Sequence, residues 1–156
     1  MNEGLEVVSL LEQLKRDRVS PNLYIITPFL IIAGNLRSLI RESAVLNFLV
    51  DKPGDWLEEH IGTVHTVQGR EAEAVFFVLG GPLTIHRGAR GWAGGKPNLV
   101  NVAVTRAKEV MYVIGNRHLW KDAGVFRELS DRLPVTHLKD VLPTTNKPDK
   151  HSAASY

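Results

Sequence analysis

The stretch from Ile61 to Leu79, IGTVHTVQGREAEAVFFVL, decides the fold class of this chain. It predicts two buried strands, Ile61 to His65 and Ala74 to Leu79, because both are short apolar runs rich in β-branched or aromatic residues. The polar residues between the two strands predict a turn. Strands that are apolar on both faces are typical of a parallel sheet that helices cover on both sides.

Further strands and helices flank that stretch in alternation. Short apolar runs predict two more strands, at Leu23 to Ile26 and at Val110 to Ile114. Apolar residues at helical spacing predict helices at Glu6–Arg18, Phe29–Phe48, Asn98–Ala107 and Val125–Leu133. This order of elements indicates an α/β domain of three layers with a mainly parallel sheet. In such sheets the functional residues gather at the carboxyl ends of the strands, where we expect Thr27, the His65–Glu71 stretch and the loop after Leu79.

Three segments are expected to be irregular. The Pro-Gly pair in Asp51–Asp55 predicts a turn, and six glycines in Gly80–Lys96 predict an irregular or mobile loop. From Asp140 onward Pro, Thr, Lys and Ser dominate, which is typical of a disordered tail. We therefore expect one domain over residues 1–139 and a disordered tail over residues 140–156.

Composition excludes several classes of protein and favours an anionic partner. The chain has no cysteine, hence no disulfide framework or thiolate metal site, and no apolar run long enough for a membrane span. We expect a soluble, intracellular and cytoplasmic protein without a metal site of its own. The formal net charge is only +2, but no Asp or Glu occurs from Ala74 to Lys108, where five basic residues lie. Such a block favours phosphate or nucleic acid, although a solvated surface would look the same.

Two segments resemble motifs V and VI of superfamily 1 helicases of the Upf-like and Dna2/Nam7-like group. They are Ile61 to Val78 and Asn101 to Asn116, NVAVTRAKEVMYVIGN, and each flanks a predicted strand. In addition, Thr27-Pro28-Phe29 resembles the Thr-Pro-Tyr or Thr-Pro-Phe element of the same domain. The resemblance covers Leu23 to Asn116 and implies a RecA-like domain of P-loop NTPase type, the second (2A) of the two motor domains.

The resemblance implies a role for the turn of motif V in binding ATP with Mg²⁺. Glu71 is similar to a glutamate that reaches the sugar or phosphate region of the nucleotide, and Gln68 and Arg70 resemble residues linking that site to the nucleic-acid track. Gly69 permits a backbone conformation that other residues resist. Without the resemblance, these four residues would also suit a capped turn with solvated charges.

Arg106 resembles the arginine finger of the Thr-Arg-Ala element in motif VI. A guanidinium is always charged and binds phosphate oxygens with two parallel hydrogen bonds. Supplied across the cleft between two RecA-like domains, it would offset the charge that develops on the γ-phosphoryl group. The alternative is a helical salt bridge to Glu109, three residues along the chain.

Nucleic-acid contacts are predicted on two grounds. By resemblance, Thr63 and His65 match positions that touch the nucleic-acid backbone, and Thr27 belongs to the Thr-Pro-Phe element. By chemistry, Arg87, Arg90 and Trp92 combine cations with an aromatic ring, which suits single-stranded nucleic acid, with DNA favoured over RNA. A structural histidine at residue 65 and a merely solvated loop around Trp92 are the alternatives.

The chain lacks the residues that hold ATP phosphates and magnesium in the family. No Walker A sequence and no strand ending in Asp-Glu occurs in it, and the family places both on the N-terminal RecA-like domain. We therefore expect a C-terminal motor domain of an ATP-dependent DNA or RNA helicase whose ATP site is completed by that other domain. A stand-alone nucleic-acid-binding or regulatory module is the alternative. Val67 stands where phenylalanine is common, and Ile32-Ala33-Gly34 replaces a glutamine-bearing stretch, so the resemblance does not carry nucleic-acid contacts over to that helix.

Overall fold

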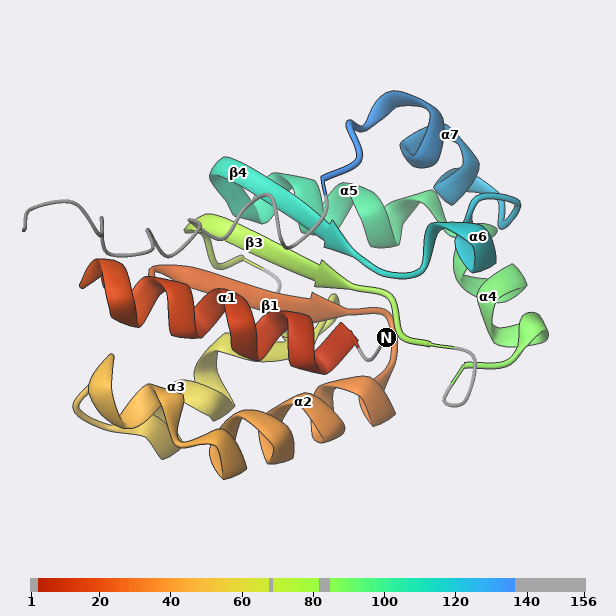
Figure 1. Ribbon diagram of the computed structural model, residues 1–156. Helices are drawn as coiled ribbons and strands as arrows, with labels where there is room; N and C mark the ends of the chain where they lie inside the picture. The colour runs from red at the N-terminus through yellow and green to blue at the C-terminus, as the bar shows by residue number, and fades with distance from the viewer. Residues whose placement is uncertain (1–2, 68, 82–84, 137–156) are drawn as a thin grey trace, which may run out of the picture.

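The computed structural model of the chain describes residues 3–67, 69–81 and 85–136. Four strands form one parallel sheet in the order β2-β1-β3-β4 (Figure 1). The strands are β1 Leu23–Thr27, β2 Ile61–Thr63, β3 Ala72–Val78 and β4 Ala107–Ile114. Because all four run the same way, the sheet has one carboxyl edge, where the strands end, and one amino edge, where they begin. The predicted α/β fold with a parallel sheet, consistent with a RecA-like domain, is confirmed.

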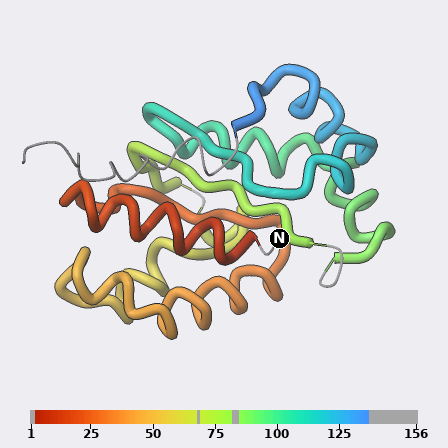
Figure 2. The backbone as a smooth tube through the Cα atoms, in the orientation of Figure 1, coloured from red at the N-terminus to blue at the C-terminus, as the bar shows by residue number. Residues whose placement is uncertain are grey.

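Helices cover both faces of this sheet, as the ribbon and the tube show (Figures 1 and 2). On one face α1 (Glu3–Asp17) packs against α2 (Leu30–Ser43), and on the other α5 (Pro97–Arg106) packs against β3 and β4. The connection from β1 through α2 to β2 runs toward one edge strand of the sheet, and the connection from β3 through α5 to β4 runs toward the other. Right-handed connections that run in opposite directions lie on opposite faces of the sheet. The shorter helices are η1 Val45–Phe48, α3 Pro53–His60, α4 Arg87–Gly94, α6 Arg117–Trp120 and α7 Val125–Arg132.

The core lies around β1 and β3. Every residue of β1 is buried, and Ile25, Ile26 and Phe77 have no exposed surface. Strand β4 is at the edge and is mostly half-buried or exposed. No helix among the described residues is long and apolar enough to cross a membrane.

The helix predicted from Phe29 to Phe48 is broken, and the turn predicted at Asp51–Asp55 is mostly helical. Ala44 has a left-handed backbone (φ 56°), which ends α2 and starts the 3₁₀ turn η1. Pro53 occupies the first turn of α3, where its missing N–H costs no hydrogen bond, and Trp56 and Leu57 bury the inner face of that helix. Packing therefore overrode the local signals in both segments.

The prediction of an irregular loop over Gly80–Lys96 is wrong for its second half, which forms α4. His86 caps this helix, its Nδ1 accepting a hydrogen bond from the Ala89 N–H at 3.2 Å. Gly94 allows close packing instead of flexibility, since a Cβ there would lie 2.4 Å from the carbonyl oxygen of Ala123. Residues 82–84 and the tail predicted over 140–156 lie outside the described residues.

Candidate functional site

The segment from Val64 to Glu71 crosses from the carboxyl edge of the sheet to its amino edge. Strand β2 pairs with the last part of β1, with Thr63 opposite Thr27, so β2 ends at the carboxyl edge. Leu23, the first residue of β1, lies opposite Ala74, and β3 begins two residues earlier, at the amino edge. The crossing segment stays against the core, since Val64 and Val67 are buried. The expectation that the whole His65–Glu71 stretch lies at the carboxyl edge is therefore wrong, because its last residues reach the amino edge.

The turn at the amino edge holds two charged side chains in fixed contacts. Gly69 has a φ of +85°, the left-handed conformation for which glycine was expected. The Arg70 Nη1 donates to the carbonyl oxygen of Glu59 at 3.2 Å, at the C-terminus of α3, where a positive charge is favourable. Glu71 pairs with Lys108 at 3.8 Å, and both are well exposed. Gln68 lies outside the described residues.

Arg106 joins this group because β3 and β4 pair at their first residues, Ala72 opposite Ala107. The Arg106 Nη1 donates to the carbonyl oxygen of Arg70 at 3.2 Å, and Nη2 donates to the Thr105 Oγ1 at 3.2 Å. Among the described residues no ion pair joins Arg106 to Glu109, so the alternative salt bridge is not formed. The Arg106 Nε is buried and has no hydrogen-bond partner.

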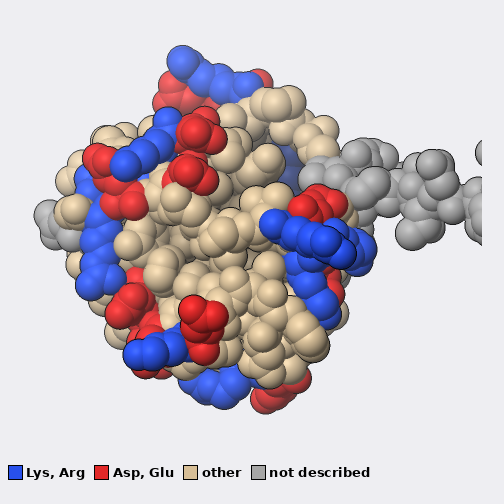
Figure 3. Space-filling model, turned by 90° about the vertical axis from the view of Figure 1, so that its left-hand side faces the viewer, with Lys and Arg blue, Asp and Glu red and all other residues tan. Residues whose placement is uncertain are grey.

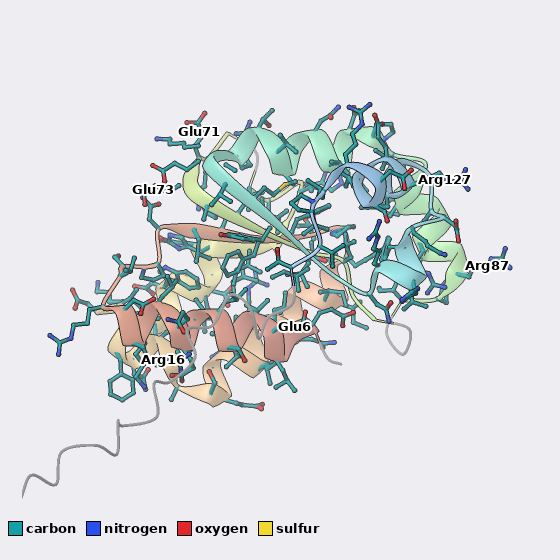
Figure 4. All side chains as sticks on the ribbon, turned by 45° about the horizontal axis from the view of Figure 1, so that its top comes forward. Glu6, Arg16, Glu71, Glu73, Arg87 and Arg127 are labelled. Carbon is teal, nitrogen blue, oxygen red and sulfur yellow. The ribbon has the colours of Figure 1, made fainter. Side chains whose placement is uncertain are left out.

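The unpartnered Nε leaves Arg106 with a donor that no other group of the described residues uses. Buried N–H groups are nearly always hydrogen-bonded, so this donor can take a partner from outside the chain. The surroundings carry both signs of charge, with Glu71 and Glu73 pointing outward at this end of the domain (Figures 3 and 4). The donors of Arg106 fit a phosphate oxygen, but the edge offers only a few donors and no phosphate-binding loop.

A stacked aromatic group next to Arg70 was missed in the sequence. His60 lies between Trp56 and Tyr24, with ring centroids 4.7 Å and 5.2 Å away, and its Nδ1 is 3.1 Å from the Trp56 carbonyl oxygen. Burial lowers the pKa of His60, although the bond to the Trp56 carbonyl opposes this shift. The four-residue spacing of Trp56 and His60 on a helix is the signal that could have revealed the stack.

At the carboxyl edge the two predicted threonines support the backbone. Thr27 has no exposed surface, and its Oγ1 accepts a hydrogen bond from the Phe29 N–H at 3.3 Å. Thr63 is 5% exposed, and its carbonyl oxygen accepts from both the N–H and the hydroxyl of Thr66, at 3.0 Å and 2.9 Å. The Thr27 side chain and the Thr63 backbone therefore shape the ends of β1 and β2, and contacts of both threonines with nucleic acid stay predictions.

An open hollow of about 640 Å³ lies at the same edge and brings Thr63 and His65 together with Trp92, which lies far from them in the sequence. The remaining residues around it are mostly apolar: Pro28, Phe29, Leu30, Ile31, Thr66 and Ala89. Arg87 is exposed on α4 at this end of the domain (Figure 4). Arg90 is half-buried and donates from its Nη1 to the Ile85 carbonyl oxygen at 2.6 Å, so it anchors the start of α4.

Comparison with known families identifies the kind of domain to which the chain belongs. A family model described as an AAA domain matches residues 1–118. The chain belongs to this family. Its members occur in superfamily 1 helicases, in the C-terminal region of Upf1/Dna2-like proteins, which makes the chain a helicase-like motor domain. Among curated proteins none matches the chain.

Proposed function

We propose that this chain is the C-terminal motor domain of an ATP-dependent helicase and that its amino edge faces ATP held by an N-terminal RecA-like domain. The observation that carries the proposal is the state of Arg106, a half-buried guanidinium whose Nε has no hydrogen-bond partner and which forms no ion pair with a carboxylate of the described residues. A purely structural arginine would have its donors satisfied by this chain.

In this proposal Arg106 is the arginine finger. Its bond to the Arg70 carbonyl holds the guanidinium at the amino edge, from which its remaining donors would meet the γ-phosphate of ATP. Glu71, exposed beside it, would contact the sugar or phosphate region, and Gly69 and Arg70 would form the turn that carries Glu71. The Mg²⁺ ligands and the phosphate-binding loop would belong to the other domain.

The carboxyl edge would be part of the track for single-stranded nucleic acid, with DNA favoured over RNA. His65 and Trp92 line the hollow, and Arg87 is exposed at the same end of the domain. Phosphate contacts by such cations release counterions, so binding by this edge should be weak in the isolated chain and should fall steeply with salt.

Steady-state ATP hydrolysis tests whether turnover needs both domains. We expect no turnover by the chain alone, with or without single-stranded DNA, and turnover once a Walker A domain precedes it in the same protein. Turnover by the chain alone that Arg106→Ala removes would overturn the proposal. Tight nucleic-acid binding by the chain that does not respond to salt would instead favour a stand-alone module.

A further inference from the structure

The hollow at the carboxyl edge has an unusual composition for the surface of a soluble domain. Leu30 is 76% exposed, Ile31 58% and Trp92 48%, and all three line the same hollow. Scattered apolar side chains on a surface need no explanation, but a contiguous group around a hollow is typical of a binding site. Leu30 and Ile31 open helix α2, whose first four residues are all apolar.

The indole of Trp92 is held in place by a row of aromatic rings. Phe29 lies 6.1 Å from Trp92 and 6.4 Å from Trp120, centroid to centroid. Trp120 is itself fixed, because it is buried and its Nε1 donates to the Gly80 carbonyl oxygen at 3.1 Å. The Trp92 ring is therefore supported from inside the domain while about half of its surface faces the hollow.

The sequence segments that form the hollow carry basic residues and no carboxylates. The residues that line it come from three segments, 18–41, 61–70 and 74–108, and none of these segments contains Asp or Glu. Lys96 places its Nζ 5.2 Å from the centroid of the Trp92 ring, and Arg87 is exposed five residues before Trp92. An apolar hollow with cations and no carboxylates suits a ligand that has flat apolar groups on a polyanionic backbone.

We propose that this hollow is a base-binding pocket that takes an unstacked nucleobase of single-stranded nucleic acid. The inference rests on the proposed function and specifies how the carboxyl edge contacts its ligand. The base stacks on the exposed part of Trp92, with Leu30 and Ile31 as the opposite wall, while Lys96 and Arg87 contact the adjoining phosphates. The apolar helix start of α2 thus replaces polar backbone contacts with contacts to bases.

The polar groups at the hollow predict little discrimination between bases. Besides the indole N–H of Trp92, the side-chain donors and acceptors of the lining residues are those of Thr63, His65 and Thr66, and the hydroxyl of Thr66 already donates to the Thr63 carbonyl. Stacking on an aromatic ring tolerates every base, because each has a flat π-face. We therefore expect comparable binding of oligonucleotides that differ in base sequence.

Fluorescence anisotropy with two labelled oligonucleotides tests the pocket. One probe is an oligothymidylate, and the other has the same sugar–phosphate length with abasic sites in place of the bases. Stacking of one base predicts that the chain binds the abasic probe about 5- to 150-fold more weakly. Trp92→Ala should remove that difference, Trp92→Phe should keep most of it, and Leu30→Ser, at a highly exposed position, should reduce it without affecting folding.

Phe48 provides a matched control. It is also an exposed aromatic residue (71%) with a lysine over its ring, Lys15 at 4.0 Å, but Lys15 is paired with Glu12. Phe48→Ala should leave binding of both probes unchanged. Equal binding of both probes by the unaltered chain would overturn the base pocket and leave the nucleic-acid track standing, whereas binding of neither probe at low salt would overturn both.

Discussion

At the amino edge of the sheet two contacts lie close together: Arg106 donates to the backbone carbonyl of Arg70, and Glu71 pairs with Lys108. At the carboxyl edge, Phe29 and Trp92 face an apolar hollow with a lysine above the indole. The first arrangement suits a small, highly charged ligand such as a phosphate group, and the second suits flat apolar groups joined by phosphates. Under the proposed function, the amino edge would contact ATP and the carboxyl edge would contact the nucleic acid.

The same crossing segment serves both edges. It leaves β2 beside Thr63, passes over the core through Val67 and delivers Arg70 to the amino edge. Arg70 then contacts the end of α3 with its side chain and Arg106 with its carbonyl oxygen.

The largest expected effect belongs to Arg106, and it should be confined to the amino edge. In a protein with the Walker A domain present, Arg106→Ala should lower kcat by about 10³- to 10⁵-fold, because an arginine finger acts mainly in the transition state. Nucleotide affinity should change far less. Arg106→Lys should not restore turnover, since an ammonium keeps the charge but loses the planar pair of donors.

Arg132 is the control for that experiment, because it is exposed and paired with Glu128 on α7. Arg132→Ala should leave kcat unchanged. Single-strand binding by the Arg106→Ala protein should also stay near normal, which separates the two edges. A folded Arg106→Ala protein with near-normal kcat would refute the arginine-finger assignment.

Substitution of a core residue should impair the functions of both edges, because both depend on the same folded sheet. Phe77 has no exposed surface, lies in β3 and stacks on Phe126 at 6.3 Å. Phe77→Ala should cost about 3–5 kcal/mol of unfolding free energy, because it removes buried surface and leaves a cavity. Urea denaturation measures this loss, and both ATP hydrolysis and strand binding should fall in proportion to the unfolded fraction. Loss of only one of the two activities would contradict a shared core.

The parallel sheet could be predicted from the sequence because its signal is long and redundant. All four strands are apolar runs, and β1 is buried along its whole length, as its sequence indicates. The element boundaries that failed depend on single residues with weak signals, such as the left-handed Ala44, or on glycines used for close packing, such as Gly94. Tertiary contacts determine these conformations, and local sequence propensity does not predict such contacts.

The sequence singles out residues for the candidate site but does not show where in the fold they lie. Glu71, Arg106 and Trp92 stand out by type and by motif, yet sequence order put the motif V turn at the wrong edge of the sheet. The crossing from β2 to β3 becomes visible only when Thr63 is paired with Thr27 and Ala72 with Ala107. The aromatic row through Phe29 and Trp120 was also invisible, because residues far apart in sequence build it.

A smaller effect on the amino edge is expected from Gly69. A Cβ at this position meets nothing within 4 Å, so Gly69→Ala acts only through the backbone, whose φ is +85°. The left-handed conformation should cost about 1–2 kcal/mol of unfolding free energy in an L-residue.

Gly54 is the matched control, since a Cβ there would also meet nothing within 4 Å but its backbone is helical. Gly54→Ala should raise the unfolding free energy by about 0.4–1 kcal/mol, and urea denaturation compares the two variants. A neutral Gly69→Ala would mean that the turn relaxes freely.

The smallest effect should be a pH dependence that originates beside the amino edge, at His60. Burial lowers the pKa of its imidazole in the folded chain, so below about pH 6.5 the unfolded chain binds the proton more readily than the folded chain. The contribution of His60 to the free energy of unfolding is therefore complete above about pH 6.5. It decreases as the pH falls through and below that value. His60→Phe keeps a flat ring between Trp56 and Tyr24 but cannot titrate, so its unfolding free energy should change less over this range. The measurement is urea denaturation of both proteins at several pH values, and the difference between them isolates His60 from the other histidines. A difference that does not vary with pH, or that grows in favour of the unaltered chain as the pH falls, would show that folding does not lower the pKa of His60.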